Sequence, residues 1–143
     1  MPNIALTQAR QIIVAAFEKA EKLELLPLSV AVLDAGGHTT AFERQDGASA
    51  MRFKIAHGKA YGAICMGLGS RTLFERARVQ PYFIDAMNAL ADGALVPVPG
   101  GVLIRDQDGA LLGAVGVTGD NSDNDEKCAI AGIEAAGLVA DPG

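Results

Sequence analysis

The strongest constraint on the fold is a pattern that occurs twice: two apolar, β-branched runs separated by a turn containing aspartate and glycine. The first copy spans residues 28–44 with its turn at 34–37, and the second spans residues 102–118 with its turn at 106–109. Glycine adopts the positive φ that tight hairpin turns require. Each copy therefore predicts a β-hairpin, and two hairpins favour an antiparallel sheet.

Helical periodicity occupies the segments before, between and after the hairpins. Apolar side chains recur at three- and four-residue steps over residues 6–23, and Pro27 closes that segment. The order of elements is then α-β-β-α-(α)-β-β-α, which predicts one α+β domain over residues 1–143 with helices packed on the sheet. The remaining helices are expected over residues 49–66, 70–78, 81–91 and 123–139.

Charge and composition restrict the classes of partner. The chain carries 12 basic and 17 acidic residues, a net charge of −5, and half of it is hydrophobic. An acidic chain without a basic stripe argues against nucleic acid and against an anionic membrane surface as partners. Apolar surface left over in so short a chain predicts a homo-oligomer. Two cysteines and the absence of a secretion signal predict a reduced, cytoplasmic protein.

The helix expected over residues 49–66 carries the first candidate site residues, His57 and Lys59. Histidine binds haem iron and acts as an acid or base near neutral pH. Lys59 lies among alanines, and a partly desolvated lysine amine can act as a catalytic base. Residues two apart on a helix point about 200° apart, so one pocket cannot receive both side chains squarely. A structural histidine and a solvated lysine are the alternatives.

Two further clusters carry candidate chemistry. The end of the first hairpin places Glu43, Arg44 and Asp46 together, and Arg44 can hold a carboxylate through two hydrogen bonds. Gly100 and Gly101 follow a proline-rich connector, and paired glycines allow close approach of a backbone to a ligand. A surface ion pair and a plain tight turn are the respective alternatives.

These motifs, in this order, resemble the GlcG/HbpS family, which includes the C-terminal domain of PduO. The resemblance implies a profilin-like arrangement of α/β/α layers with a five-stranded antiparallel sheet, a compact homo-oligomer that is often an octamer, and haem binding, with haem degradation in some members. The segments that carry it are residues 30–38, 41–48, 55–60, 99–102, 112–119 and 129–132.

The resemblance also implies site residues at matching positions. Lys59 lies in the family's Gly-Lys-Ala helix motif, while His57 and Tyr61 occupy positions where this chain departs from the family pattern. A changed pocket implies a changed ligand. Glu43 and Asp46 match the family's strand-end motif, and Gly100 and Gly101 match its glycine pair. The expected ligand-binding residues are these four together with His57 and Tyr61, which are candidates from their own chemistry and not from the family pattern.

Three hypotheses for function follow. The first is a haem-binding module, with haem degradation as its activity in one form of the hypothesis. Its iron ligand is His57, with His38, Tyr61, Cys65 and Met66 as other candidates. The second is a cofactor-free isomerase or lyase acting on a small organic acid. In it, Lys59 is the acid or base, Arg44 holds the carboxylate, and Gly100 and Gly101 stabilise an enolate oxygen. The third is a ligand-sensing or accessory protein without catalysis. All three place these residues around one cavity.

Overall fold

The computed structural model describes residues 2–143 and contains one five-stranded antiparallel sheet in the order β2-β1-β4-β3-β5. Both predicted hairpins are confirmed, and they meet at the centre of the sheet, where β1 pairs with β4. The five-stranded sheet implied by the family resemblance is also confirmed. The strands are β1 (Ser29–Asp34), β2 (Thr39–Arg44), β3 (Gly101–Arg105), β4 (Leu111–Thr118) and β5 (Val139–Asp141).

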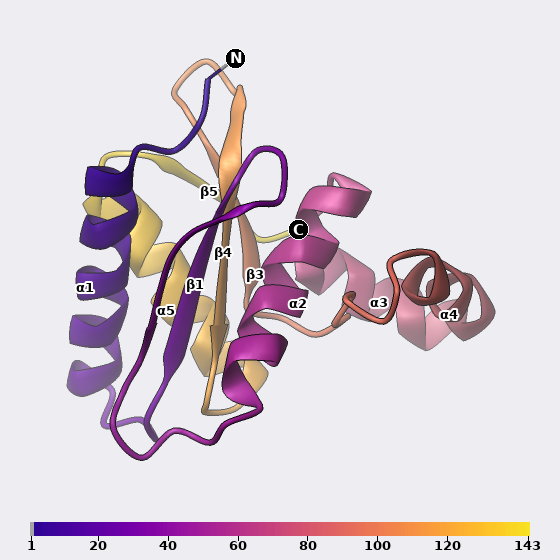
Figure 1. The fold of residues 1–143 in the computed structure, drawn as a ribbon, viewed down its shortest axis with the longest axis horizontal. Helices are drawn as coiled ribbons and strands as arrows, with labels where there is room; N and C mark the ends of the chain where they lie inside the picture. Colours follow the sequence, from indigo (N-terminus) through magenta and orange to yellow (C-terminus); the bar gives the residue numbers. More distant parts are fainter. Residues whose placement is uncertain (1) are drawn as a thin grey trace.

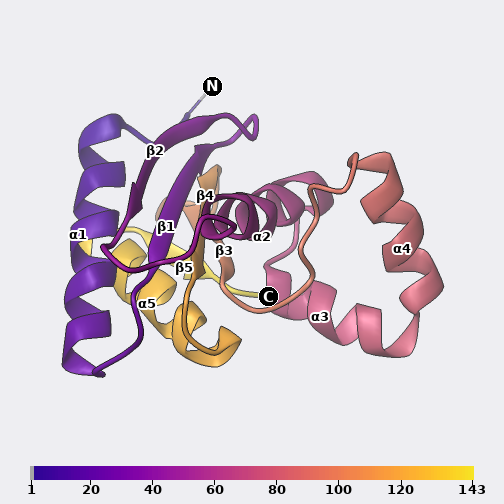
Figure 2. The ribbon, with the colours of Figure 1, turned by 60° about the horizontal axis from the view of Figure 1, so that its bottom comes forward.

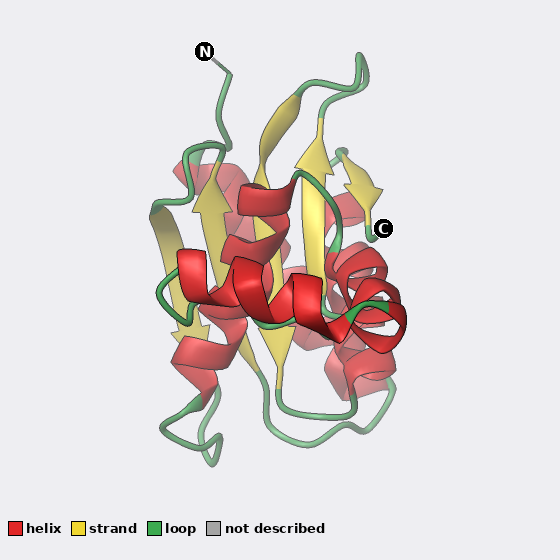
Figure 3. Cartoon of the chain, turned by 90° about the vertical axis from the view of Figure 1, so that its right-hand side faces the viewer, coloured by secondary structure: helices red, strands yellow, loops and turns green. Residues whose placement is uncertain are grey.

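Helices cover both faces of the sheet, as Figures 1 and 3 show. α1 and α5 pack against each other on one face, and α2 lies on the other. Strand alternation divides the core accordingly, because Val30 and Val32 point toward α1 and α5 while Leu33 points toward α2. The helices are α1 (Leu6–Lys22), α2 (Arg52–Met66), α3 (Ser70–Val79), α4 (Pro81–Leu90) and α5 (Ser122–Ala135).

The C-terminal end differs from the sequence expectation. The predicted helix over 123–139 ends at Ala135, and the chain turns through Gly137, which has a φ of +76°. Residues Val139–Asp141 then form β5, which pairs with β3 at the edge of the sheet. The helix prediction was wrong there because β5 is short and its pairing partner lies far away in sequence.

α3 and α4 project away from the layered body, beyond the α2 side of the sheet (Figure 2). A small cluster of Leu73, Ile84 and Leu95 holds this part together. Pro81 stands in the first turn of α4, where its missing N–H costs no hydrogen bond. Within residues 2–143, no helix combines the length and apolar character that spanning a membrane would require.

Glycines let α2 lie directly on the strands. A Cβ at Gly116 would overlap the carbonyl oxygen of Ala56, and a Cβ at Gly101 would overlap that of Lys59. Only glycine permits so close an approach between a helix backbone and a sheet. This contact fixes the depth at which the side chains of α2 are buried.

Candidate functional site

The solvent-facing side of α2 carries a row of four side chains at four-residue steps: Phe53, His57, Tyr61 and Cys65. We call these residues the α2 row. Residues four apart lie above one another on a helix, so the row forms one continuous stripe. Phe53 and Cys65 are exposed, while His57 and Tyr61 are half-buried. The stripe is therefore open to a ligand along its length.

Ring stacking orders the aromatic members of the row. The ring centroids of His57 and Tyr61 are 5.3 Å apart and their planes differ by 16°. Phe53 lies 6.0 Å from His57, and its ring meets Phe42 of β2 edge-on at 4.7 Å. Such contacts restrict the rotamers of these side chains. The row thus presents an aromatic surface of defined shape.

Two cavities open along the α2 row, and the segment from α4 to Leu95 forms their opposite wall. One cavity, of about 360 Å³, touches Phe53, Lys54 and His57. The other, of about 200 Å³, touches Tyr61 and Cys65. Their remaining lining residues are Asp92, Gly93 and Ala94 for the first, and Met66, Met87, Leu90, Ala91 and Leu95 for the second.

The row combines three types of side chain that ligate haem iron: imidazole, phenol and thiol. Burial lowers the pKa of His57, so its imidazole is neutral at pH 7 and keeps a lone pair for a metal. Hydrogen bonding to Cys65 raises the pKa of Tyr61, which keeps the phenol protonated. His57 is therefore the member of the row best prepared to bind iron, and these donors and aromatic rings fit a haem group.

Lys59 lies on the opposite side of α2, where its side chain is only 2% exposed. Its Nζ donates hydrogen bonds to the Val117 carbonyl oxygen at 2.9 Å and to Oδ2 of Asp125 at 3.1 Å. Burial lowers the pKa of Lys59 and raises that of Asp125, while the opposite charge of the partner offsets each shift. This arrangement ties α2 to β4 and α5. The catalytic role of Lys59 stays a prediction.

Gly100 and Gly101 are buried beside the same lysine. A Cβ at Gly100 would lie 2.9 Å from the Lys59 amine, so the lysine side chain occupies the space above this glycine. The Gly101 N–H donates to Oγ of Ser70 at 2.7 Å. The structure thus brings the glycine pair together with Lys59, as expected from the sequence, with the lysine rather than an open cavity against the glycines. Their ligand-binding role stays a prediction.

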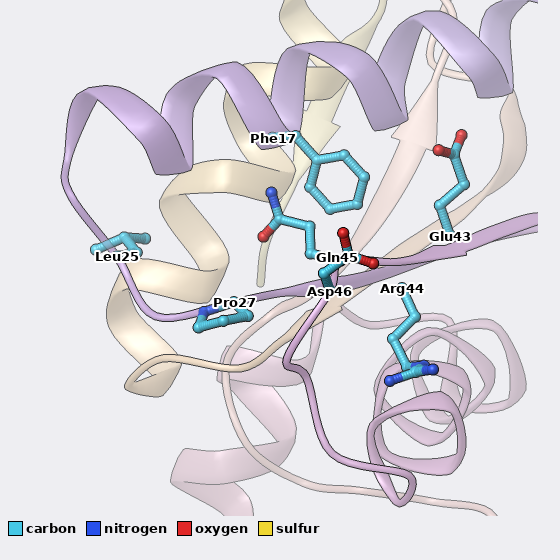
Figure 4. Close-up of a pocket in the computed structure, with 7 residues that line it drawn as sticks. All are labelled: Phe17, Leu25, Pro27, Glu43, Arg44, Gln45 and Asp46. Carbon is cyan, nitrogen blue, oxygen red and sulfur yellow. The ribbon is translucent and has the colours of Figure 1, made fainter.

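The end of β2 lies elsewhere, beside a cleft of about 540 Å³ between α1 and the sheet edge (Figure 4). Glu43 and Asp46 lie on the Phe17 side of this cleft, while the Arg44 guanidinium points away from α1. Nη1 of Arg44 donates a hydrogen bond to the Ala48 carbonyl oxygen at 2.6 Å. The expectation of one shared cavity was therefore wrong, because the candidate residues occupy three separate places.

The structure also places the other iron-ligand candidates named from the sequence. His38 is 82% exposed in the β1–β2 turn and interacts with Asp34 through Nδ1 at 3.2 Å. Met66 is half-buried and packs with the α3–α4 cluster. Sequence reasoning missed Asp125 as the partner of Lys59, because its place in the first turn of α5 is explained by the helix dipole alone. A buried lysine requires a counter-charge, so the predicted desolvation of Lys59 could have prompted a search for a carboxylate such as Asp125.

Comparisons with known proteins give consistent results. Residues 4–134 match the family described as haem-degrading protein HbpS-like. An uncharacterized 15.0 kDa protein of Citrobacter freundii, from the dhaT–dhaS intergenic region, is 30% identical over 123 residues, which are 86% of this chain and 84% of that protein. The corrinoid adenosyltransferase PduO of Salmonella typhimurium is 30% identical over 122 residues, 85% of this chain, and the match spans only 35% of that protein.

Solved structures agree with the sequence comparisons. The crystal structure of a PduOC–haem complex superposes with a TM-score of 0.84 at 26% identity, covering 95% of this chain and 96% of that one. A double mutant of Streptomyces reticuli HbpS gives a TM-score of 0.79 at 30% identity, covering 94% of this chain and 87% of that one.

Proposed function

The chain belongs to the HbpS-like family, and from this premise we propose that it is a haem-binding module. The observation that carries the proposal is the α2 row, which lines two cavities with imidazole, phenol and thiol groups on one side of a helix. The haem bound in the similar PduOC structure supports the same assignment. The third sequence hypothesis, a sensing or accessory role without catalysis, is compatible with haem binding.

In this proposal, different side chains hold different parts of the haem group. His57 supplies the iron ligand, because its neutral imidazole faces a cavity and no hydrogen bond from residues 2–143 engages its ring. Phe53 and Tyr61 supply apolar surface for the macrocycle. Lys54, which lines the same cavity as His57, supplies a cation for a propionate. Bound haem would contribute redox and oxygen chemistry at its iron.

Self-association is part of the same proposal. Val79, Tyr82 and Leu90 are 76%, 70% and 77% exposed on the projecting α3–α4 part, and exposed apolar side chains of this size favour a subunit interface. The octamer common in the family is the assembly that we propose. Its mass in solution, measured by light scattering after size exclusion, tests this point. Haem degradation and a cytoplasmic location remain expectations, the latter supported by the free thiols of Cys65 and Cys128.

A hemin titration of the apo-protein tests haem binding. We expect a saturable Soret band, and we expect His57→Ala to weaken binding by at least about tenfold because it removes a ligand. His38→Ala is the matched control, since this exposed histidine lies outside the α2 row and should leave the titration unchanged. A featureless Soret region, or equal affinity in His57→Ala, would contradict the proposal.

A further inference from the structure

Polar side chains gather where β1, β2 and β4 meet the start of α2. Ser29 of β1 lies opposite Arg44 of β2 and opposite Thr118 of β4. Directly paired residues of an antiparallel sheet place their side chains on the same face. Ser29, Arg44 and Thr118 therefore all lie on the α2 face. Arg52, the first residue of α2, joins them by donating from Nη1 to Oγ1 of Thr118 at 2.8 Å.

The hydroxyl at the centre of this group lacks a partner. Ser29 is 0% exposed, and its Oγ forms no hydrogen bond with any of residues 2–143. Buried hydroxyl groups are normally hydrogen-bonded, because leaving one unpaired loses its interaction with water. An unpaired hydroxyl between Arg44 and Thr118, the latter already bound by Arg52, indicates that a hydrogen-bonding group is missing from the site.

Both neighbouring guanidinium groups lack a counter-ion. In the described part of the chain, neither Arg44 nor Arg52 forms an ion pair. Arg10 and Arg76 form none there either, whereas Arg71, Arg78 and Arg105 pair with carboxylates. A guanidinium offers five N–H donors, and Arg44 and Arg52 each use one side-chain nitrogen, toward Ala48 and Thr118 respectively. Both arginines therefore keep unused donors, Arg44 opposite Ser29 in the sheet and Arg52 against Thr118, the other residue opposite Ser29.

We propose that Ser29, Arg44, Arg52 and Thr118 form a binding site for a small oxyanion, a carboxylate or a phosphate. The guanidinium groups supply charge-assisted donors, and the Ser29 hydroxyl rotates to donate a further hydrogen bond. The amino-terminal end of α2, a helix of 15 residues, contributes a favourable dipole. Arg44 is exposed at the edge strand, so the anion enters from that side. Glu43 points to the other face and does not oppose it (Figure 4).

An NMR titration of the unmodified protein is the first test. Inorganic phosphate and acetate are added separately at constant ionic strength, with chloride as the balancing anion. We expect saturable shifts of the backbone amides of Ser29, Arg44 and Thr118 with at least one of the two anions. Shifts that do not saturate, or that appear equally with chloride, would overturn the site.

Charge-removing variants are the second test. Arg44→Gln and Arg52→Gln should each raise the dissociation constant of the bound anion by at least about tenfold, because each removes a charge-assisted donor. Arg10→Gln makes the same change in net charge on exposed α1 and should have no effect. Equal weakening in all three variants would show general charge attraction and would contradict a built site. The titration of the unmodified protein remains decisive should a variant fail to fold.

A third experiment asks whether the bound anion is a haem propionate or a free anion. Of the three experiments, only this one depends on the haem-binding proposal. Phe42, two residues before Arg44 on the same face of β2, contacts Phe53 of the α2 row, so the two sites are neighbours. Phosphate that competes with hemin in the unmodified protein, and no longer does so in Arg44→Gln, assigns the site to a haem propionate. Absence of competition assigns it to a free anion. Failure to bind hemin would overturn the haem proposal and leave the first two tests intact.

Discussion

The polar side chains on the two sides of α2 differ in burial and in hydrogen bonding. Lys59, on the inner side, is buried and donates hydrogen bonds to Val117 and Asp125. His57, two residues earlier on the outer side, faces a cavity and stacks on Tyr61. A satisfied buried group contributes to stability, whereas an available half-buried group can bind a ligand. The difference teaches that exposure and partner count, rather than residue type, separate a structural position from a binding position on one helix.

Breaking the inner side should have the largest effect. Lys59→Met leaves the Asp125 carboxylate buried without its counter-charge, with only the Asp120 N–H still donating to it. We expect a loss of about 3–5 kcal/mol in the free energy of unfolding. The double variant Lys59→Met/Asp125→Leu should recover part of that loss, because both charges are then gone. Guanidinium chloride unfolding measures both. Lys54→Met, on the exposed side, should change stability by less than about 0.5 kcal/mol, and an equal loss there would contradict the comparison.

Glycine substitutions on the two sides sharpen the contrast. Gly116→Ala should cost about 1–3 kcal/mol, since the added methyl group overlaps the Ala56 carbonyl and forces α2 away from the sheet. Gly62→Ala, within α2, meets Leu95 at Cγ (3.0 Å) and at Cα (3.5 Å), so this buried leucine must shift slightly. A gain of up to about 1 kcal/mol in helix propensity offsets that cost, so the net change should be smaller than for Gly116→Ala. We therefore expect thermal unfolding to separate the two variants clearly. Similar melting temperatures would refute the inner contact as a determinant of stability.

The aromatic contact between β2 and the outer side of α2 should contribute less to the free energy of unfolding than the inner contacts do. The rings of Phe42 and Phe53 meet edge-on at 4.7 Å, a geometry worth about 0.5–1.5 kcal/mol beyond the area buried. A double-mutant cycle with Phe42→Leu and Phe53→Leu isolates this coupling energy in urea unfolding. Additive losses in the cycle would show that the two rings are energetically independent.

The pH response of the outer side should be the smallest effect. Burial lowers the pKa of His57 from its ordinary value of 6.5, so the unfolded chain takes up this proton at higher pH than the folded protein does. The contribution of His57 to stability is therefore present above pH 6.5 and is lost as the pH falls through and below that value. His57→Gln should flatten this part of the stability–pH curve relative to the unmodified protein. Identical curves for the two proteins would contradict the burial argument.

Much of the fold could be predicted from the sequence because its signals are local. The Asp- and Gly-containing turns predicted both hairpins, and the three- and four-residue spacing of apolar side chains predicted α1. β5 could not be found, because its three residues pair with β3 at a long sequence separation. The alanines around Lys59 indicated desolvation correctly, but its partner Asp125 lies 66 residues away. The cavities beside the α2 row depend on how the segment after α4 folds back, which no local pattern encodes.

The central β1–β4 ladder has a consequence for the order of assembly. It joins residues 29–34 to residues 113–118, so the sheet closes only after the intervening helices have been brought together. Closing so long a loop costs conformational entropy before the new contacts repay it, and folds dominated by such contacts form slowly. The local hairpins should therefore form early, and the docking of one hairpin on the other should set the folding rate of the whole chain.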